Sequence, residues 1–412
     1  KEKNKKYEVG ITLIALVVTV VVLIIIAGVT LSLTIGNGGI MKRAKTAVND
    51  YASQDTKEEK HFNDLADWVD KNGRENEYIK VPVNTKTEEN GTINGKKPGT
   101  NNPVIPGGYT PIDAGDAKWG NGSSAPTQDS VDHGLVIKDD SNNEWVWIPV
   151  EASVLSSMYE TSNDGIALSG DVGVTTKMYT KTTTVTVTIP RSTPNTTSFR
   201  EPDLVLGSDG TSYDYANYAT AGFSSLANMA ETMKSDYEEM IKSLEKYKGF
   251  YIGRYELTAN GEKTGATQTC ENGVNWYTLY ANCKKWAKEG SKVKTRMIWG
   301  LQWDVTCNWL AGSGFDIKDS SKWGNYSNND ATGHGSKQNT GSSESWKANN
   351  IYDFVGNCWE FTQEAFGTGD RASCGGGCSG TGSNFPASGP SYSSPTGPGS
   401  YDGSRPTLYL IP

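Results

Sequence analysis

Histidine is scarce in this chain, and clustered basic charge is missing. The three histidines, His61, His133 and His334, lie far apart in the sequence, so no zinc site with closely spaced ligands is visible. Lysine and arginine number 39 against 47 aspartate and glutamate residues, which gives a net charge of −8. Because contacts to nucleic-acid phosphates need clustered lysine and arginine, this balance argues against a nucleic-acid partner. The sequence also lacks a P-loop, a dinucleotide fingerprint and a Ser-His-Asp arrangement.

Charged side chains are absent from residues 9–41, directly behind a lysine-rich start. The stretch is apolar from Ile11 onward, and about 20 apolar residues are enough for a helix to cross a bilayer. Positive charge flanking such a span tends to stay in the cytoplasm. We therefore expect a membrane helix that leaves everything after Met41 outside the cell. The alternative is a secretory signal that is removed, although the apolar core is longer than a usual signal.

The start of this apolar stretch resembles the prepilin motif of type IV pilins. Residues 10–14 read Gly-Ile-Thr-Leu-Ile, and the resemblance implies a leader, residues 1–10, that is cleaved between Gly10 and Ile11. It further implies a pilin-like transmembrane and stalk helix over residues 11–75.

The same resemblance implies self-association into a filament through residues 11–70, on the surface of a bacterial cell. In the family, a glutamate at the fifth mature position neutralises the amino terminus of a neighbouring subunit. This chain has Ala15 there, which leaves a monomeric membrane anchor as the alternative.

A long head follows the stalk. Residues 76–105 are rich in Asn, Thr, Gly, Lys and Pro, which is typical of a linker. Beyond them, strand patterns such as 144–150 and 250–256 are mixed with helical spacing such as 226–244. Mixed short elements with long loops predict an α+β fold.

Four segments of the head occur in an order that is similar to the formylglycine-generating-enzyme family, a branch of the C-type lectin fold. The resemblance covers residues 106–412 with an insertion at about 152–245, and its fourth segment matches the D-x-x-G-N-x-W-E-W pattern except for Phe361. The four segments are residues 145–149, 250–256, 299–304 and 351–362. The resemblance implies a C-type-lectin-like domain behind the pilin-type helix.

The resemblance also implies a Ca²⁺ site at the turn in the fourth segment. Its ligands would be the side chains of Asp353 and Glu360 and the carbonyl groups of Gly356 and Cys358. Carboxylates and carbonyls on a flexible turn are the ligands that calcium prefers. The alternative is that both acids accept hydrogen bonds from amides of the turn, without a metal. We expect Trp359 to fill the core beneath this turn.

Enzymes of this family oxidise a substrate cysteine with a copper-binding cysteine pair that follows an R-x-x-x-G-G-S stretch. The matching stretch here is residues 371–377, where Cys374 precedes the glycines. Cys378 lies close to the first expected position, and no second cysteine follows it. We therefore expect no enzyme activity, with a copper-dependent cysteine oxidase as the weakest alternative. The six cysteines of an extracellular chain are compatible with disulfides, and the sequence leaves their pairing open.

Five residue types are missing from the end of the chain. Residues 365–412 contain no Lys, Glu, Gln, Met or Trp, and every residue in them can be encoded by a codon that ends in a pyrimidine. Related C-type-lectin-like domains are targets of diversity-generating retroelements, which randomise adenines in such a segment. The resemblance implies a hypervariable ligand-binding face, for which the best contact residues are Asn384, Phe385, Tyr392, Tyr401 and Asp402. The alternative is a low-complexity Gly/Ser/Pro loop.

These features together predict an extracellular, pilin-like display protein for adhesion or recognition. Its lectin-type head would bind a protein or glycan ligand through the C-terminal face. A structural subunit of a pilus-like filament without a dedicated ligand remains the main alternative.

Overall fold

The computed structural model describes the head and a few isolated residues before it. The predicted cleavage site at Gly10 and Ile11 and the predicted stalk helix of residues 11–75 lie outside the described set, apart from Val20. Within that set, no helix combines the length and the apolar character that a bilayer span requires. The described residues are Val20, Lys86, 90–92, 97–112, 131–158, 160–167, 175–180, 199–258, 268–287 and 291–412.

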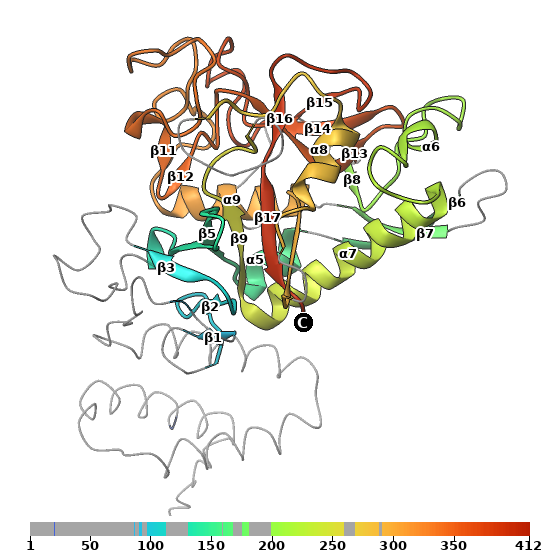
Figure 1. The fold of residues 1–412 in the computed structure, drawn as a ribbon, viewed down its shortest axis with the longest axis horizontal. Coiled ribbons are helices and arrows are strands. Elements are labelled where there is room, and N and C mark those ends of the chain that lie inside the picture. Colours follow the sequence, from blue (N-terminus) through green and yellow to red (C-terminus); the bar gives the residue numbers. More distant parts are fainter. Residues whose placement is uncertain are drawn as a thin grey trace, which may run out of the picture. The chain divides into compact units, whose positions relative to one another are not determined.

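An antiparallel sheet of six strands forms the centre of the head (Figure 1). In β5 and β9, which are neighbours in this sheet, Trp147 lies opposite Tyr251. The last strand, β17, lies between β10 and β9, so the end of the chain is inside the sheet. The spatial order is β10 (Val293–Met297), β17 (Pro406–Leu410), β9 (Gly249–Gly253), β5 (Glu144–Pro149), β4 (Val136–Lys138) and β3 (Thr110–Ile112).

Alternating side chains of this sheet enter two separate cores, because successive residues of a strand point to opposite faces. In β5, Val146 and Ile148 belong to the larger core, whereas Trp145 and Trp147 belong to the smaller one. All four side chains are fully buried. A strand that is buried on both faces reads as a continuous apolar run, which explains the strong strand pattern at 144–150.

Helix α7 (Leu226–Tyr247) packs its apolar side chains into the larger core. The hydroxyl of Ser225 accepts a hydrogen bond from the amide of Asn228 at 3.1 Å and caps the first turn. The helix ends at Lys248, which has a left-handed backbone with φ 62°. Most of α7 falls within the predicted insertion of about residues 152–245, and its apolar face packs into the larger core.

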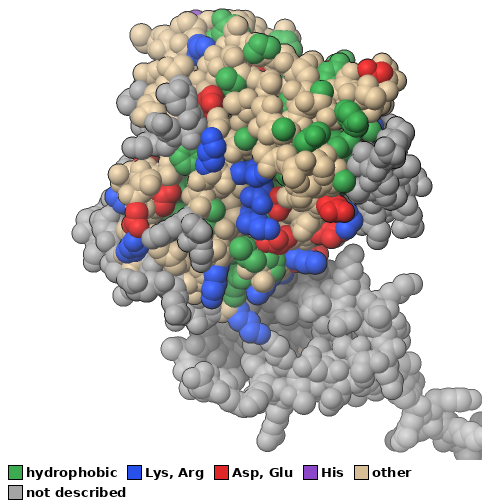
Figure 2. Space-filling model, turned by 45° about the vertical axis from the view of Figure 1, so that its right-hand side comes forward, with side chains coloured by type: hydrophobic (Ala, Val, Ile, Leu, Met, Phe, Trp, Pro, Cys, Tyr) green, Lys and Arg blue, Asp and Glu red, His purple; other side chains and the backbone are tan. Residues whose placement is uncertain are grey.

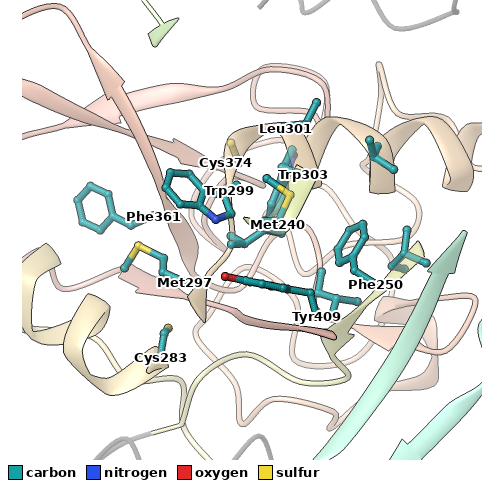
Figure 3. Close-up of a cluster of buried hydrophobic side chains, with 14 of the residues drawn as sticks. Met240, Phe250, Cys283, Met297, Trp299, Leu301, Trp303, Phe361, Cys374 and Tyr409 are labelled. Carbon is teal, nitrogen blue, oxygen red and sulfur yellow. The ribbon is translucent and has the colours of Figure 1, made fainter. Parts of the chain in front are cut away.

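The remaining helices are shorter, and three of them contribute side chains to the same core. Figure 3 shows Met240 of α7, Trp303 of α9 and Tyr409 of β17 converging on this cluster, with Phe361 beside them. The mixture of helices and antiparallel strands confirms the predicted α+β class. The bounds are α5 (Ala152–Met158), α6 (Asp214–Asn217), α8 (Trp276–Cys283), α9 (Gly300–Gly312) and the 3₁₀ turn η4 (Glu344–Trp346).

A second sheet carries most of the C-terminal segment. Its strand β13 pairs with β14 and β8 in antiparallel fashion and with β16 in parallel fashion. Figure 1 shows β14, β15 and β16 close together at the top of the head, where the loops between them also lie. The strands are β6 (Glu160–Ala167), β7 (Thr175–Thr180), β8 (Phe199–Glu201), β13 (Trp359–Phe366), β14 (Asp370–Cys374), β15 (Ser391–Ser393) and β16 (Asp402–Ser404).

Two short hairpins complete the described strands. One joins β1 (Gly91–Thr92) to β2 (Val104–Ile105), and the other joins β11 (Lys347–Ala348) to β12 (Ile351–Tyr352). The second hairpin leads directly into the turn for which calcium is predicted.

Candidate functional site

The turn between β12 and β13 depends on a glycine. Gly356 has a φ of +75°, and a Cβ atom there would lie 2.4 Å from the carbonyl oxygen of Asn325. The Gly356 amide donates to the carbonyl of Gly375 at 2.7 Å, and the Asn357 amide donates to the carbonyl of Asn325 at 3.0 Å. Only glycine combines this backbone conformation with so close an approach. The turn is thus fixed against two neighbouring loops.

Trp359 does not fill the core beneath the turn, which corrects the expectation from the sequence. It is partly exposed, and its ring meets the ring of Phe385 edge to face at a centroid distance of 5.1 Å. The side chain two positions on, Phe361, is the one that is fully buried in the core. Residues 359 and 361 share one face of β13, because side chains alternate along a strand, but Trp359 is the first residue of the strand and lies against Phe385.

Asp353, the first predicted calcium ligand, is held by the loop that precedes β11. Its Oδ2 atom accepts hydrogen bonds from the Gly341 amide at 2.7 Å and from the Thr340 hydroxyl at 3.1 Å. Its Oδ1 atom is buried and has no hydrogen-bond partner among the described residues. Burial raises the pKa of Asp353 to about 6, although these bonds and Arg405 lower it.

Glu360, the last predicted ligand, forms an ion pair with Arg405 inside the protein. The Arg405 Nε atom donates to Oε1 and Oε2 of Glu360 at 3.0 and 3.1 Å, and Nη2 donates to Oε1 at 2.6 Å. Neither side chain is more than 1% exposed. Burial raises the pKa of Glu360 to about 7, and the Arg405 charge opposes this shift.

The predicted calcium ligands do not fit a calcium ion in this arrangement. The carboxylate of Glu360 already accepts hydrogen bonds from the guanidinium of Arg405. The same guanidinium donates to the backbone carbonyl of Asp353 at 2.9 Å. A calcium ion needs six to eight oxygen ligands, and here a fixed cation uses the oxygens nearest to Glu360. The alternative, in which both acids accept hydrogen bonds from amides of the turn, does not describe them either. Asp353 accepts from the Gly341 amide in the loop before β11, and Glu360 pairs with Arg405.

A third buried acid, Glu256, lies behind the same turn. Its Oε2 atom accepts a hydrogen bond from the Asn357 side-chain amide at 2.6 Å, and its Oε1 atom accepts one from the Cys358 backbone amide at 3.2 Å. Burial and the charges of Asp353 and Glu360 raise its pKa well above the ordinary value of 4.5. Three carboxyl groups therefore share one buried arginine.

Cys358, the remaining predicted ligand, forms a disulfide with Cys270. This pairing joins residues 88 positions apart, and it is one of the pairings that the sequence left open. The two sulfur atoms and a Glu256 carboxylate oxygen lie within 4.8 Å of one another, but disulfide sulfurs are not thiolates and do not offer a metal the ligands it needs. The four cysteines outside this disulfide are all buried: Cys283, Cys307, Cys374 and Cys378.

Four of the five predicted ligand-contact residues gather at one place. Asn384 and Phe385 are exposed on the loop between β14 and β15, and the Phe385 ring contacts Trp359. The backbone amide of Trp359 donates to the Tyr401 carbonyl at 2.7 Å. This bond holds the loop between β15 and β16 next to Trp359. Asp402 follows Tyr401, is partly exposed, and begins β16.

We call Trp359, Phe385 and Tyr401 together with Lys337 the aromatic patch. The Lys337 ammonium lies 5.6 Å from the centre of the Tyr401 ring and donates to the Ser400 carbonyl at 3.2 Å. Phe385 and Tyr401 are 38% and 43% exposed. The sequence did not single out Lys337, and nothing in its local pattern distinguishes it from other surface lysines.

Tyr392, the fifth predicted contact residue, lies apart from the aromatic patch. It is 48% exposed on β15, and its ring stacks on Phe366 at 3.8 Å between centroids. Phe366 ends the same eight-residue strand that Trp359 begins. At about 3.3 Å per residue, the two ends of β13 are on the order of 20 Å apart, so Tyr392 forms a second exposed contact point.

A rigid frame holds the loops from below. The Tyr326 hydroxyl contacts the carbonyl groups of Gly375 and Phe385, at 2.5 and 2.7 Å. The indole nitrogen of Trp303 donates to the Ala387 carbonyl at 2.9 Å. These buried donors fix the backbone on both sides of Phe385, so an exposed side chain there is presented in one place.

Arg371 is a further buried residue whose role the sequence did not show. Its Nη2 atom donates to Oδ2 of Asp214 at 2.6 Å, and its guanidinium lies 4.2 Å from the centre of the Trp276 ring. Both partners of this ion pair are fully buried. Burial raises the pKa of Asp214 and Arg371 opposes that shift. The pair joins the C-terminal segment to α6 and α8.

No family model matches the chain, and none of the curated proteins matches it. Several solved structures are similar to part of it, among them the three that follow. The Treponema denticola variable protein 1 has 18% identity and a TM-score of 0.29, over 40% of this chain and 85% of that protein. CarF has 14% identity and a TM-score of 0.29, over 40% and 87%. PvdO from Pseudomonas aeruginosa has 14% identity and a TM-score of 0.35, over 67% and 98%.

At these identities and TM-scores the likeness carries no argument about activity or ligand. The α+β class rests on the strands and helices themselves. The C-type-lectin-like assignment stays a prediction from the four sequence segments.

Proposed function

We propose that the head is a recognition domain, displayed on a bacterial surface, that binds a protein or glycan ligand through the aromatic patch and the loops around it. In this proposal residues 11–75 supply the anchor or the filament contact. The segment that carries the loops is a candidate for sequence diversification, because its exposed positions are separated from the buried residues that hold the fold.

The observation that carries the proposal is the exposure of aromatic side chains on a fixed frame. Among the described residues, the large hydrophobic side chains that are exposed include Phe385, Tyr392 and Tyr401, all from one short stretch of the chain. Single exposed apolar residues need no explanation, whereas a contiguous group marks an interaction surface, and Phe385 and Tyr401 form such a group with Trp359. Tyrosine offers a large contact area at low entropic cost, and Ser, Gly and Asn around it offer adaptable contacts.

The loops that carry these aromatic residues are themselves uncharged, and Lys337 and Asp402 are charged residues beside Tyr401. Residues 375–401 contain no Lys, Arg, His, Asp or Glu. Figure 2, which keeps the loops at the top, shows mostly uncharged side chains there and the acidic and basic side chains gathered lower down. Ligand contacts through these loops therefore rest on aromatic stacking and neutral hydrogen bonds.

The proposal is tested by replacing both aromatic loop residues of the patch in the full chain. Phe385→Ala with Tyr401→Ala should abolish adhesion of cells that display the protein to their target surface. Tyr215→Ala is the matched control, because Tyr215 is 45% exposed but lies on α6, and it should leave adhesion unchanged. Full adhesion by the double variant, at equal surface display, would contradict the proposal and favour the structural filament subunit.

Diversification of the segment has its own test in the genome. We expect a reverse-transcriptase gene and a near-copy of the DNA for residues 365–412 close to the gene for this protein, with differences confined to adenines of the copy. Differences should fall on exposed positions such as Asn384 and Tyr392 and spare the buried Arg371 and Arg405. A neighbourhood without such a copy would remove the hypervariable part and leave the binding part standing.

The cysteine-oxidase alternative receives no support from the buried thiols. Burial raises the pKa of Cys378 and of Cys283, whereas a reactive cysteine needs a lowered pKa. Copper-dependent oxygen consumption with a cysteine peptide would revive this alternative.

A further inference from the structure

We propose that Arg405 is the resident cation of the turn between β12 and β13, so that the head keeps its fold and its aromatic patch without calcium. This inference concerns how the turn is held and does not depend on the ligand of the patch.

The guanidinium of Arg405 contacts oxygen atoms from three separate parts of the chain. Its Nη1 atom donates to the carbonyl of Gly253 at 2.9 Å. Its Nη2 atom donates to the carbonyls of Tyr352 and Asp353, each at 2.9 Å. Its Nε and Nη2 atoms share the Glu360 carboxylate. One planar cation thus joins the end of β9, the start of the turn and β13, which is the joining role expected of a bound metal ion.

These contacts also position the aromatic patch. Glu360 directly follows Trp359 in β13, and Arg405 directly follows β16, which pairs with the start of β13. Tyr401, at the other side of β16, is bonded through its carbonyl to Trp359. The ion pair between Glu360 and Arg405 is therefore close in sequence to the backbone that carries Trp359 and Tyr401.

The remaining negative charge of the cluster does not call for a second cation. Glu256 already accepts hydrogen bonds from Asn357 and Cys358 on its two oxygens. Asp353 accepts hydrogen bonds on Oδ2 from the Gly341 amide and the Thr340 hydroxyl. The guanidinium of Arg405 and these donors therefore already bind the carboxylates of the cluster.

The first test uses the unaltered full chain. Its thermal unfolding midpoint should be the same in EDTA and in excess calcium chloride. A calcium-dependent rise in the midpoint that is lost in Glu360→Gln would overturn the proposal, because it would place an ion at this carboxylate. This measurement on the unaltered chain shows whether calcium binds at the turn even if the arginine variants below do not fold.

The second test removes the guanidinium. Arg405→Ser opens a space beside the Glu360 carboxylate and the carbonyls of Gly253, Tyr352 and Asp353, and we expect calcium to restore part of the lost unfolding midpoint. Arg371→Ser is the matched control, since Arg371 is equally buried and paired with Asp214, and calcium should not rescue it. A calcium response that fails to distinguish the two variants would count against the proposal.

Discussion

The C-terminal segment combines two kinds of residue that behave in opposite ways. Arg371 and Arg405 are its basic residues, and both are fully buried against a carboxylate. Its aromatic residues divide, because Tyr409 lies in the core while Phe385 and Tyr401 face the solvent. Here charge lies inside and aromatic rings lie outside, the reverse of the usual distribution.

This contrast shows how one segment can be both a fixed frame and an adaptable surface. The buried ion pairs tie the segment to α6, to β13 and to the turn before it, and they contribute nothing to the exterior. The loops of residues 375–401 between them contain only neutral side chains, and their exposed positions take no part in the core. A change in a loop residue therefore leaves the frame intact, whereas a change in either arginine does not.

The largest expected effect comes from removing one arginine. Arg405→Met or Arg371→Met should lower the free energy of unfolding by about 3–5 kcal/mol, because each leaves a buried carboxylate without its partner. Chemical denaturation of the purified head measures this loss. Lys318→Met, at an exposed lysine, should change stability by less than about 0.5 kcal/mol. Equal effects at all three positions would break the comparison between frame and surface.

A smaller loss is expected at the glycine of the turn. Gly356→Ala should cost about 2–4 kcal/mol, since the positive φ strains alanine and the new Cβ would meet the Asn325 backbone. Gly367 offers a matched control, because it has a φ of +55° but no atom lies within 4 Å of the position that its Cβ would take. Gly367→Ala should cost only about 1 kcal/mol. Thermal unfolding of both variants separates the backbone strain from the close contact.

The buried acids of this frame should make the free energy of unfolding depend on pH. Asp353 and Glu360 have ordinary pKa values of 3.8 and 4.5, which burial raises to about 6 and about 7. The folded state therefore holds protons that the unfolded state releases, and stability that is present at low pH is lost as the pH rises through the folded pKa values. From pH 4.5 to pH 7.5 we expect a loss on the order of 5 kcal/mol, about 2 from Asp353 and about 3 from Glu360.

Denaturation curves across this pH range measure the slope, and two variants locate its source. Glu256→Gln should flatten it, because it removes the third buried acid of the cluster. Asp209→Asn should leave it unchanged, since Asp209 is exposed and hydrogen bonds from Ser212 and Thr211 lower its pKa. A slope of the opposite sign would mean that the acids gain stability from ionisation.

The smallest effects on stability belong to the loops. Asn384→Ser and Tyr401→Ala should change the free energy of unfolding by less than about 1 kcal/mol, as is usual for exposed positions. Tyr401→Ala should nevertheless reduce ligand adhesion, which the control Tyr215→Ala should not. A large loss of stability in either loop variant would show that the loops are part of the frame after all.

Sequence patterns were sufficient for elements whose side chains repeat regularly. The apolar run at residues 144–150 became β5, the strand pattern at 250–256 became β9, and the helical spacing at 226–244 became α7. The glycine turn at 356–357 and the exposed contact residues of the loops were also accessible, because they depend on local conformation and residue type. The α+β class follows from these elements.

The interior of the site was not accessible in the same way. Arg405 pairs with Glu360 across 45 residues of sequence, and Cys270 forms a disulfide with Cys358 across 88. No local spacing in the sequence predicts either the ion pair or the disulfide. The four implied calcium ligands were placed by resemblance, which carries no information about a buried arginine from another strand. One signal was present: two arginines in a stretch that lacks lysine and glutamate are unusual, and both proved to be internal.

The absence of charge from residues 375–401 has a consequence for the kinetics of encounter. Long-range steering raises association rates only where opposite charges face each other, and salt screens it. A partner that docks on these loops would meet few charges besides Lys337 and Asp402, so we expect an association rate near the unsteered value of about 10⁵–10⁶ M⁻¹s⁻¹ and a weak dependence on salt. Differences in affinity between targets would then lie in how long each complex survives.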